Sequence, residues 1–382
     1  MNNKCTSPMI LVDHRGTTDQ LFHNINTAII AGAKSLFVLA CDANGLTPAQ
    51  ADARLRSLPV PVFGGIFPEI IAEGHTLKRG SIVCGLPVNA NVQHIDRLSD
   101  PDADYFAQAE SLSGSITPGE TLITLVDGLS KRISAVLESL YEVLGSSCPY
   151  LGGGAGSLSF EQKPCLFSNQ GLLVDCAQIT AINLPVGIGI DHGWHKFAGP
   201  FVVTGAYNNT ITTLDYRPAF EIYREVVEAD SGKRFSEHEF FDLAKAYPFG
   251  LDRLKADVVV RDPLFRNDNT LVCVGEVPAN HIIYILKGDA DTLLEASQRC
   301  AQTAMQHLPD PCMGLLFDCI SRTLFLQERF EEELGNIQSC LPQGTPLIGA
   351  MSLGEIADAD NSCLELFNKT IVLGTLGSGT TA

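Results

Sequence analysis

The chain has 382 residues, of which 45% are hydrophobic and 18% charged, and its formal net charge is −18. This composition is typical of a well-buried globular protein of two domains, and its acidic surface argues against nucleic acid or a membrane surface as a partner. No apolar run approaches the ~20 residues of a membrane span, and the N-terminus lacks a signal-peptide pattern, so we expect a cytoplasmic protein.

A strand-helix-strand-strand pattern occurs three times along the chain. In the first copy an apolar segment at 35–42 precedes a helix that Thr47 caps and Pro48 opens, and two further strands begin near residues 61 and 80. The other copies begin at 121–127 and 314–319 and repeat the same order. The first strands end in Asp42, Asp127 and Asp318, and the second strands open with Pro61, Pro149 and Pro346.

These copies are too divergent and too irregularly spaced for a stacked solenoid. They predict a two-part α+β layered fold of mixed and antiparallel sheets covered by helices. We expect an N-terminal segment at 1–29, a first domain at 30–215, a second at 216–376 and a flexible tail at 377–382.

A different pattern separates the second and third copies. Strands are predicted at 200–206 and 210–214 with a turn between them, and a helix is predicted after Pro218. Ser236 and Glu239 form a capping-box pattern that predicts the start of another helix. Strands are then expected within 258–277 and at 281–289, followed by a helix up to residue 308.

The sequence GIDHGWHKF, at 189–197, contains the single tryptophan, Trp194, between His192 and His195. The preceding VGIGI predicts a strand, on which the two histidines would point to opposite faces unless the chain turns at Gly193. Two interpretations remain open. The stretch could supply an imidazole and an apolar slot for haem, or it could be a buried structural corner.

Two C-terminal motifs carry further candidate residues. Ser352 in GAMSLGE resembles a nucleophile elbow, but no histidine follows it and residues 352–362 are predicted as a loop, which argues against a hydrolase. In DCISR, Arg322 could clamp a carboxylate or lower the pKa of Cys319, or the pair could be a buried cysteine and a solvated arginine.

The twelve cysteines include no C-x-x-C pair, so we expect packing residues rather than a zinc site or a disulfide framework.

Several motifs together resemble the FIST domain, a bacterial sensory module with N- and C-terminal parts. The resemblance extends from about residue 30 to 376. In the first part it is carried by PYLGGGAG, GIDHGW and PFVVTGAYNNTITTLDYRPAFEIY, and in the second by AYPFGL, GEVPANHIIYILKGD, LLFDCISR and PLIGAMSLGEI. One departure is that Phe367-Asn368 stands where relatives often show His-Asn, which argues against a metal role there.

The resemblance implies a small-ligand sensor, and stand-alone proteins of this length resemble the nitric-oxide-sensing NosP type. We therefore expect haem, with His192 as its axial ligand, Trp194 as a pocket wall and His195 as the other candidate, and a histidine kinase regulated by direct contact. An iron-sulfur cluster instead of haem, and a homodimer, are left open.

The alternative function is a receptor for an amino acid or another small molecule without haem, in which Arg217 and Arg322 would clamp a carboxylate. Cys319 and Glu355 are counted among the same ligand-binding candidates. A less favoured alternative is an enzyme that uses Cys319 as a nucleophile.

Overall fold

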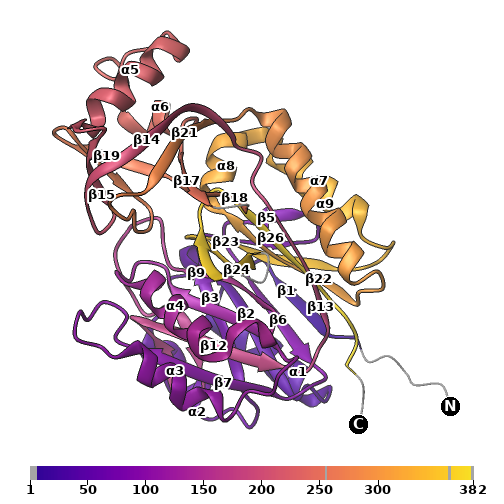
Figure 1. Ribbon diagram of the computed structural model, residues 1–382. Helices are drawn as coiled ribbons and strands as arrows, with labels where there is room; N and C mark the ends of the chain where they lie inside the picture. Colours follow the sequence, from indigo (N-terminus) through magenta and orange to yellow (C-terminus); the bar gives the residue numbers. More distant parts are fainter. Residues whose placement is uncertain (1–6, 254–255, 360–362, 380–382) are drawn as a thin grey trace.

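The computed structural model describes residues 7–253, 256–359 and 363–379, which form an α+β structure of three six-stranded sheets and one eight-stranded sheet (Figure 1). The expected α+β class with mixed and antiparallel sheets is confirmed. Residues 380–382 of the expected flexible tail lie outside the described residues. No helix within the described ranges has the length and apolar character needed to cross a bilayer.

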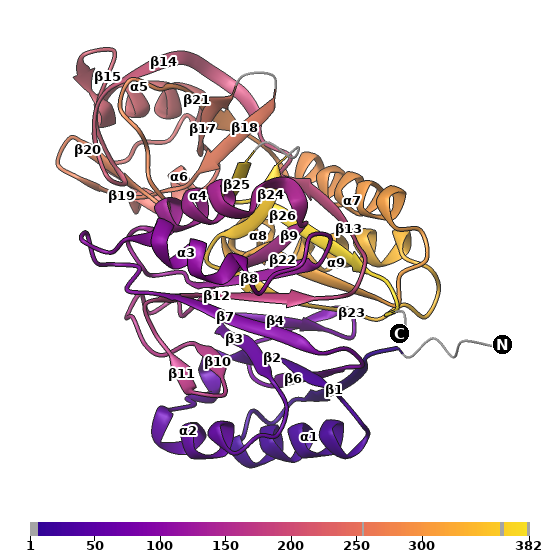
Figure 2. The same cartoon turned by 60° about the horizontal axis from the view of Figure 1, so that its bottom comes forward.

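The first sheet is built mainly from the first copy of the repeat, and α1 (Thr18–Ile30) and α2 (Pro48–Arg56) pack on it (Figure 2). A capping box at Thr47 and Pro48 in the first turn start α2 as the sequence predicts. The strand order is β1 (Met9–Asp13), β6 (Ser81–Leu86), β2 (Ser35–Cys41), β3 (Val62–Phe67), β10 (Leu166–Ser168) and β11 (Gly171–Leu173).

The second sheet is built around the second copy, and α3 (Tyr105–Ser113) and α4 (Ile133–Leu144) pack beside it. Its strand order is β25 (Cys363–Phe367), β24 (Glu355–Ala359), β9 (Tyr150–Ala155), β8 (Thr121–Asp127), β12 (Cys176–Ile182) and β7 (Ala90–Asp96). The prediction of a loop over residues 352–362 is therefore wrong for residues 355–359, because β24 pairs with β9 on one side and β25 on the other. Residues 360–362 of this prediction lie outside the described residues.

The third sheet is built around the third copy and is covered by α7 (Ala290–His307) and α9 (Phe330–Cys340). Its strand order is β13 (Val186–Asp191), β26 (Ile371–Leu376), β22 (Met313–Cys319), β23 (Leu347–Ser352), β4 (Glu69–Ala72) and β5 (His75–Leu77). The short helix α8 (Ile320–Leu326) directly follows β22. Three 3₁₀ turns complete these regions: η1 (Asp42–Asn44), η2 (Gly145–Ser147) and η3 (Gln327–Arg329).

The three copies exchange strands in a ring. Each copy contributes a parallel strand pair to its own sheet, and the segment after that pair crosses to another sheet. Strands β10 and β11 of the second copy extend the first sheet, β4 and β5 of the first copy extend the third, and β24 and β25 of the third copy extend the second. One continuous hydrophobic core therefore runs between sheets that are distant in sequence.

A glycine occupies the same register position of the second strand in every copy. Gly64, Gly152 and Gly349 lie opposite the fourth residues of the preceding parallel strands. A Cβ atom added to any of them would overlap the carbonyl oxygen of that partner residue. The glycines that mark the repeat in sequence thus mark a close approach of its two parallel strands.

Residues 195–287 form the fourth sheet and its two helices, and we call this unit the lobe and the remaining chain the body. Its strand order is β18 (Ala256–Arg261), β17 (Phe249–Arg253), β21 (Ile282–Lys287), β14 (His195–Tyr207), β15 (Thr210–Leu214), β20 (Thr270–Cys273) and β19 (Pro263–Asn267), with β16 (Arg217–Pro218) beside β15. The expected boundary near residue 215 falls inside this unit, between β15 and β16.

The lobe helices are α5 (Ala219–Ser231) and α6 (Phe240–Ala244). The predicted capping box of Ser236 and Glu239 is wrong, because α6 begins four residues later with Glu239 at its N-cap. Phe235 explains the difference: its ring packs on the rings of Phe220 and Phe240, which holds the intervening chain as a turn.

Candidate functional site

Four separated motifs of the sequence meet at the carboxyl ends of the parallel strands β22 and β23. They are GIDHGW, DCISR, SLGE and the segment between β25 and β26. Asp262 of the lobe contacts this last segment through an ion pair with Lys369. We call this cluster the polar centre, and its members are Asp262, Asp318, Cys319, Arg322, Glu333, Ser352, Glu355 and Lys369. In open α/β sheets ligands bind beyond this end of the strands, which makes the polar centre the candidate site of this chain.

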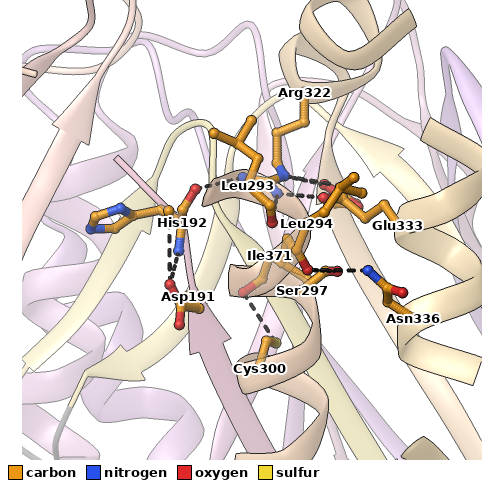
Figure 3. Close-up of polar contacts among 12 residues, drawn as sticks. Asp191, His192, Leu293, Leu294, Ser297, Cys300, Arg322, Glu333, Asn336 and Ile371 are labelled. Atoms are coloured by element: carbon orange, nitrogen blue, oxygen red, sulfur yellow. Dashed lines mark hydrogen bonds and ion pairs between the residues drawn. The ribbon is translucent and has the colours of Figure 1, made fainter. Parts of the chain in front are cut away.

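Arg322 holds the polar centre together and is fully buried. Its guanidinium forms a bidentate ion pair with Glu333 of α9, the Nε–Oε1 distance being 3.2 Å (Figure 3). The remaining N–H groups donate to the carbonyl oxygens of His192 (2.7 Å), Leu293 (3.1 Å) and Lys369 (3.2 Å). All five donors are therefore used within the chain, and the carboxylate that Arg322 clamps is the protein's own rather than that of a ligand.

Asp318 lies on the same face of the third sheet as Arg322, although the sequence groups it with Asp42 and Asp127. In the second copy, Asp127 of β8 lies opposite the last residue of β9; in the third copy, the residue opposite the last residue of β23 is Cys319. Asp318 is therefore one strand position earlier than the equivalent of Asp127, and its side chain points to the opposite face of its sheet. Neither of its oxygens accepts a hydrogen bond from a described residue, and Arg322 Nε lies 3.5 Å away. Burial, and then repulsion by Glu333, raise the pKa of this carboxyl well above its ordinary value.

Cys319, Ser352 and Glu355 face the other side of the sheet. The Ser352 hydroxyl donates to Glu355 Oε1 at 2.8 Å, and the Thr370 N–H donates to Oε2 at 3.3 Å. Burial raises the pKa of Glu355 to about 8, so this carboxyl is largely protonated at neutral pH. Burial also raises the pKa of the Cys319 thiol, which is the opposite of what a nucleophilic thiolate requires.

Trp194 forms the buried corner that its sequence suggests. It is 3% exposed, its ring meets Phe325 edge-on at 5.2 Å, and its indole N–H donates to the Lys369 carbonyl at 3.3 Å. Gly193 turns the chain with φ of 78°, a conformation that favours glycine. The ammonium of Lys369 lies 5.2 Å from the Trp194 ring centre and 3.1 Å from Asp262 Oδ2, so Trp194 sits beside an ion pair between body and lobe.

His192 does not fit an axial haem ligand in this structure. Its Nδ1 accepts the backbone N–H of Trp194 at 2.9 Å, and burial lowers its pKa, so the neutral ring carries its proton on Nε2. To bind iron, Nε2 needs a free lone pair, so the ring proton would have to be on Nδ1. The Nδ1–H and the Trp194 N–H would then be two donors facing each other, and their hydrogen bond would be lost. Figure 3 shows this imidazole directed away from Arg322.

The other histidine and the other arginine candidates lie outside the polar centre. His195 is exposed at the start of β14, and its neighbour Lys196 pairs with Asp252 at 2.6 Å rather than lining an apolar slot. Arg217 is exposed and pairs with Glu225 inside the lobe. Within the described ranges no three His, Cys, Asp or Glu side chains are grouped so that they could hold a metal ion.

Three members of the polar centre were not singled out from sequence. Glu333 stands in the run FEEE, which is typical of a solvated helix face, and Lys369 and Asp262 stand beside turns. The nearest signal in the sequence was Asp318, a carboxylate near the end of an otherwise apolar strand that is buried on both faces.

Protonation of Glu355 predicts how stability depends on pH. Because its pKa of about 8 exceeds the ordinary 4.5, the folded chain holds a proton that the unfolded chain has already released. This stabilisation is complete below pH 4.5 and is lost as the pH rises through 8. Between these two pH values, we expect the free energy of unfolding to fall by up to about 1.4 kcal/mol for each unit by which the pH rises. Urea unfolding at pH 5–8 should show a shallower pH dependence in Glu355→Gln, and identical profiles would contradict the assignment.

Comparisons with known protein families identify two domains along the chain. The family model for the FIST N domain matches residues 35–217, and that for the FIST C domain matches residues 219–358. The second match contains most of the lobe and the strands β22 and β23 that carry the polar centre. No curated protein matches the chain.

Proposed function

Because the chain belongs to the FIST-domain proteins, whose domains generally sense small ligands in signalling, we propose that it is a sensor whose ligand binds at the polar centre. The polar centre is the place where the FIST N motif GIDHGW meets the FIST C motifs DCISR and SLGE. A ligand there would contact both domains and the lobe at once. Such a position allows binding at one point to change how the parts are held together.

The observation that carries the proposal is an imbalance of buried charge. Four carboxyl groups face two cations: Arg322 is occupied by Glu333, and Lys369 is paired with Asp262. Asp318 shares Arg322 with Glu333, at 3.5 Å, and Glu355 forms no ion pair among the described residues; the raised pKa values of Asp318 and Glu355 indicate that protons neutralise them. A ligand ammonium group beside either carboxyl would supply one missing charge and three hydrogen-bond donors. We therefore propose a small primary amine, including an amino acid bound through its ammonium group, as the ligand class.

Isothermal titration calorimetry with the twenty amino acids and a set of small primary amines tests this proposal. We expect at least one amine to bind while its N-acetyl derivative does not, because acetylation removes the positive charge. Binding should release protons from Asp318 or Glu355, so the measured enthalpy should change with the ionisation heat of the buffer.

The Asp318→Asn variant should weaken binding by about tenfold or more, as expected when one charge-assisted hydrogen bond is lost. The exposed Glu225→Gln substitution is the matched control and should leave affinity unchanged. Equal binding of an amine and its N-acetyl form would exclude the proposed ligand class. A parallel haem titration in which the Soret shift is lost only in His192→Ala would favour haem instead.

We further propose that the ligand state is passed to a partner histidine kinase by direct contact, which the family resemblance supports. The expected result is a change in kinase autophosphorylation when this protein is added, with a different size in the presence of the bound amine. Measurements with the chain alone, the amine alone and both together separate the two effects. The same rate under all conditions would contradict a kinase partner.

A further inference from the structure

The lobe is joined to the body by two connections that lie side by side. The chain leaves the body through 192–194 and returns through 288–289, and the lobe ends of these connections, His195 in β14 and Lys287 in β21, are paired in register. Each connection contains a glycine, Gly193 and Gly288, and the Trp194 ring packs against Gly288 between them. Two adjacent connections define one axis about which a unit can rotate without breaking either strand.

The lobe packs its own aromatic rings together in its interior, although this interior is continuous with the core of the body. An aromatic cluster of α5, α6 and β17 fills its interior, with ring centres 5.2–6.2 Å apart. Its members are Phe220, Tyr223, Phe235, Phe240 and Phe249. None of these rings is supplied by the body, so their packing does not depend on where the lobe docks.

Polar contacts hold the lobe against the body beside apolar contacts that continue the core, and one of the polar contacts is the Arg253–Glu365 ion pair at 3.1 Å. Lys369 of the body pairs with Asp262 at 3.1 Å and donates to the Lys245 carbonyl at 3.0 Å. Arg261 donates to the Leu366 carbonyl at 2.9 Å, and the backbone of the lobe approaches that of the body chiefly where β18 meets β25. Val258, Val260 and Leu286 complete the seam beside Trp194.

The polar centre lies behind this seam without visible access from solvent. Arg322, Asp318 and Lys369 are each 0% exposed, and two surface hollows lie elsewhere, one between the C-terminal halves of α7 and α9 and one beside β4. We propose that the lobe rotates about Gly193 and Gly288, that the Lys369–Asp262 ion pair holds it closed, and that its opening admits the ligand. Only the last clause rests on the proposed function, because the rotation itself needs no ligand.

The single tryptophan makes this rotation measurable in the native chain. Trp194 shares a buried apolar cluster with lobe residues Val258, Val260 and Leu286, and its ring lies 5.2 Å from the Lys369 ammonium, so we expect its indole to gain solvent contact when the lobe lifts. The double variant Asp262→Asn/Lys369→Met removes the ion pair without leaving one buried charge unpaired. We expect it to increase acrylamide quenching of Trp194 by roughly two- to threefold, because local opening exposes buried side chains. The variant Arg217→Ala/Glu225→Ala breaks an exposed ion pair inside the lobe and should quench like the wild type.

Hydrogen exchange of the same variants separates rotation from general loosening. Rotation predicts faster exchange in peptides containing Trp194 and the β25–β26 turn, with unchanged exchange in β14 and β15 of the lobe and in β2 and β8 of the body. Unchanged quenching in the double variant would overturn the proposal, and so would faster exchange throughout. Failure of every amine to bind would overturn the proposed function while leaving the measured rotation intact.

Discussion

Replacing Arg322 by leucine is expected to lower the free energy of unfolding by about 3–5 kcal/mol, the usual cost of removing one partner of a buried ion pair. Glu333 would be left fully buried without its cation, and the carbonyl oxygens of His192, Leu293 and Lys369 would lose their donor. Because these groups belong to four separate segments, the variant should loosen the whole region beside α7–α9. Urea unfolding followed by circular dichroism measures the loss.

Two companion variants test the cause of this loss. Arg322→Leu combined with Glu333→Leu removes the unpaired carboxylate and should recover part of the stability, giving a favourable coupling in a double-mutant cycle. Arg217→Leu removes an exposed arginine whose partner is also exposed and should not change stability measurably. If Arg322→Leu unfolds at the same urea concentration as the wild type, the arginine does not hold the polar centre together.

Gly349→Ala is expected to destabilise the chain by about 2–3 kcal/mol or more, as overpacking does in tightly packed interiors. The added Cβ would overlap the carbonyl oxygen of Leu316, the residue opposite Gly349 in the parallel pair β22–β23. The two strands would have to separate at the position that carries Asp318 and Cys319 to the polar centre. Thermal and urea unfolding should both register the change.

Gly335→Ala is the matched control because it makes the same chemical change on an exposed helix position. No atom lies within 4 Å of the Cβ that would be added to Gly335 in α9. Alanine should therefore stabilise the helix by about 0.5–1 kcal/mol. Equal effects of the two substitutions would mean that the close strand approach at Gly349 carries no cost.

The sequence contains enough local signal to predict most of the repeated elements. Apolar runs bounded by Pro61, Pro149 and Pro346 predict the strand pairs, and the cap at Thr47 predicts α2. The exchange of strands between copies could not be predicted, because β10, β4 and β24 each pair with a partner strand 100 or more residues away in a register that no local pattern specifies.

The polar centre was predictable only in pieces. DCISR, SLGE and GIDHGW each stood out, but each alone was as well explained by ordinary packing. What the sequence could not supply was their convergence, or the role of Glu333, whose acidic helix face is turned inward by its pairing with Arg322. The direction of the His192 ring, which decides against iron ligation by Nε2, depends on one backbone N–H that no motif encodes.

The ring of exchanged strands also sets the order of events during synthesis. When the ribosome has delivered residues 1–217, β9 still lacks β24, β4 lacks β23 and β13 lacks β26, so three strands present unpaired edges. Exposed edges recruit other chains, and long-range pairing is slow. The first sheet is complete by Leu173, but the nascent N-terminal half must be kept from aggregating until β22–β26 emerge and the second and third sheets close.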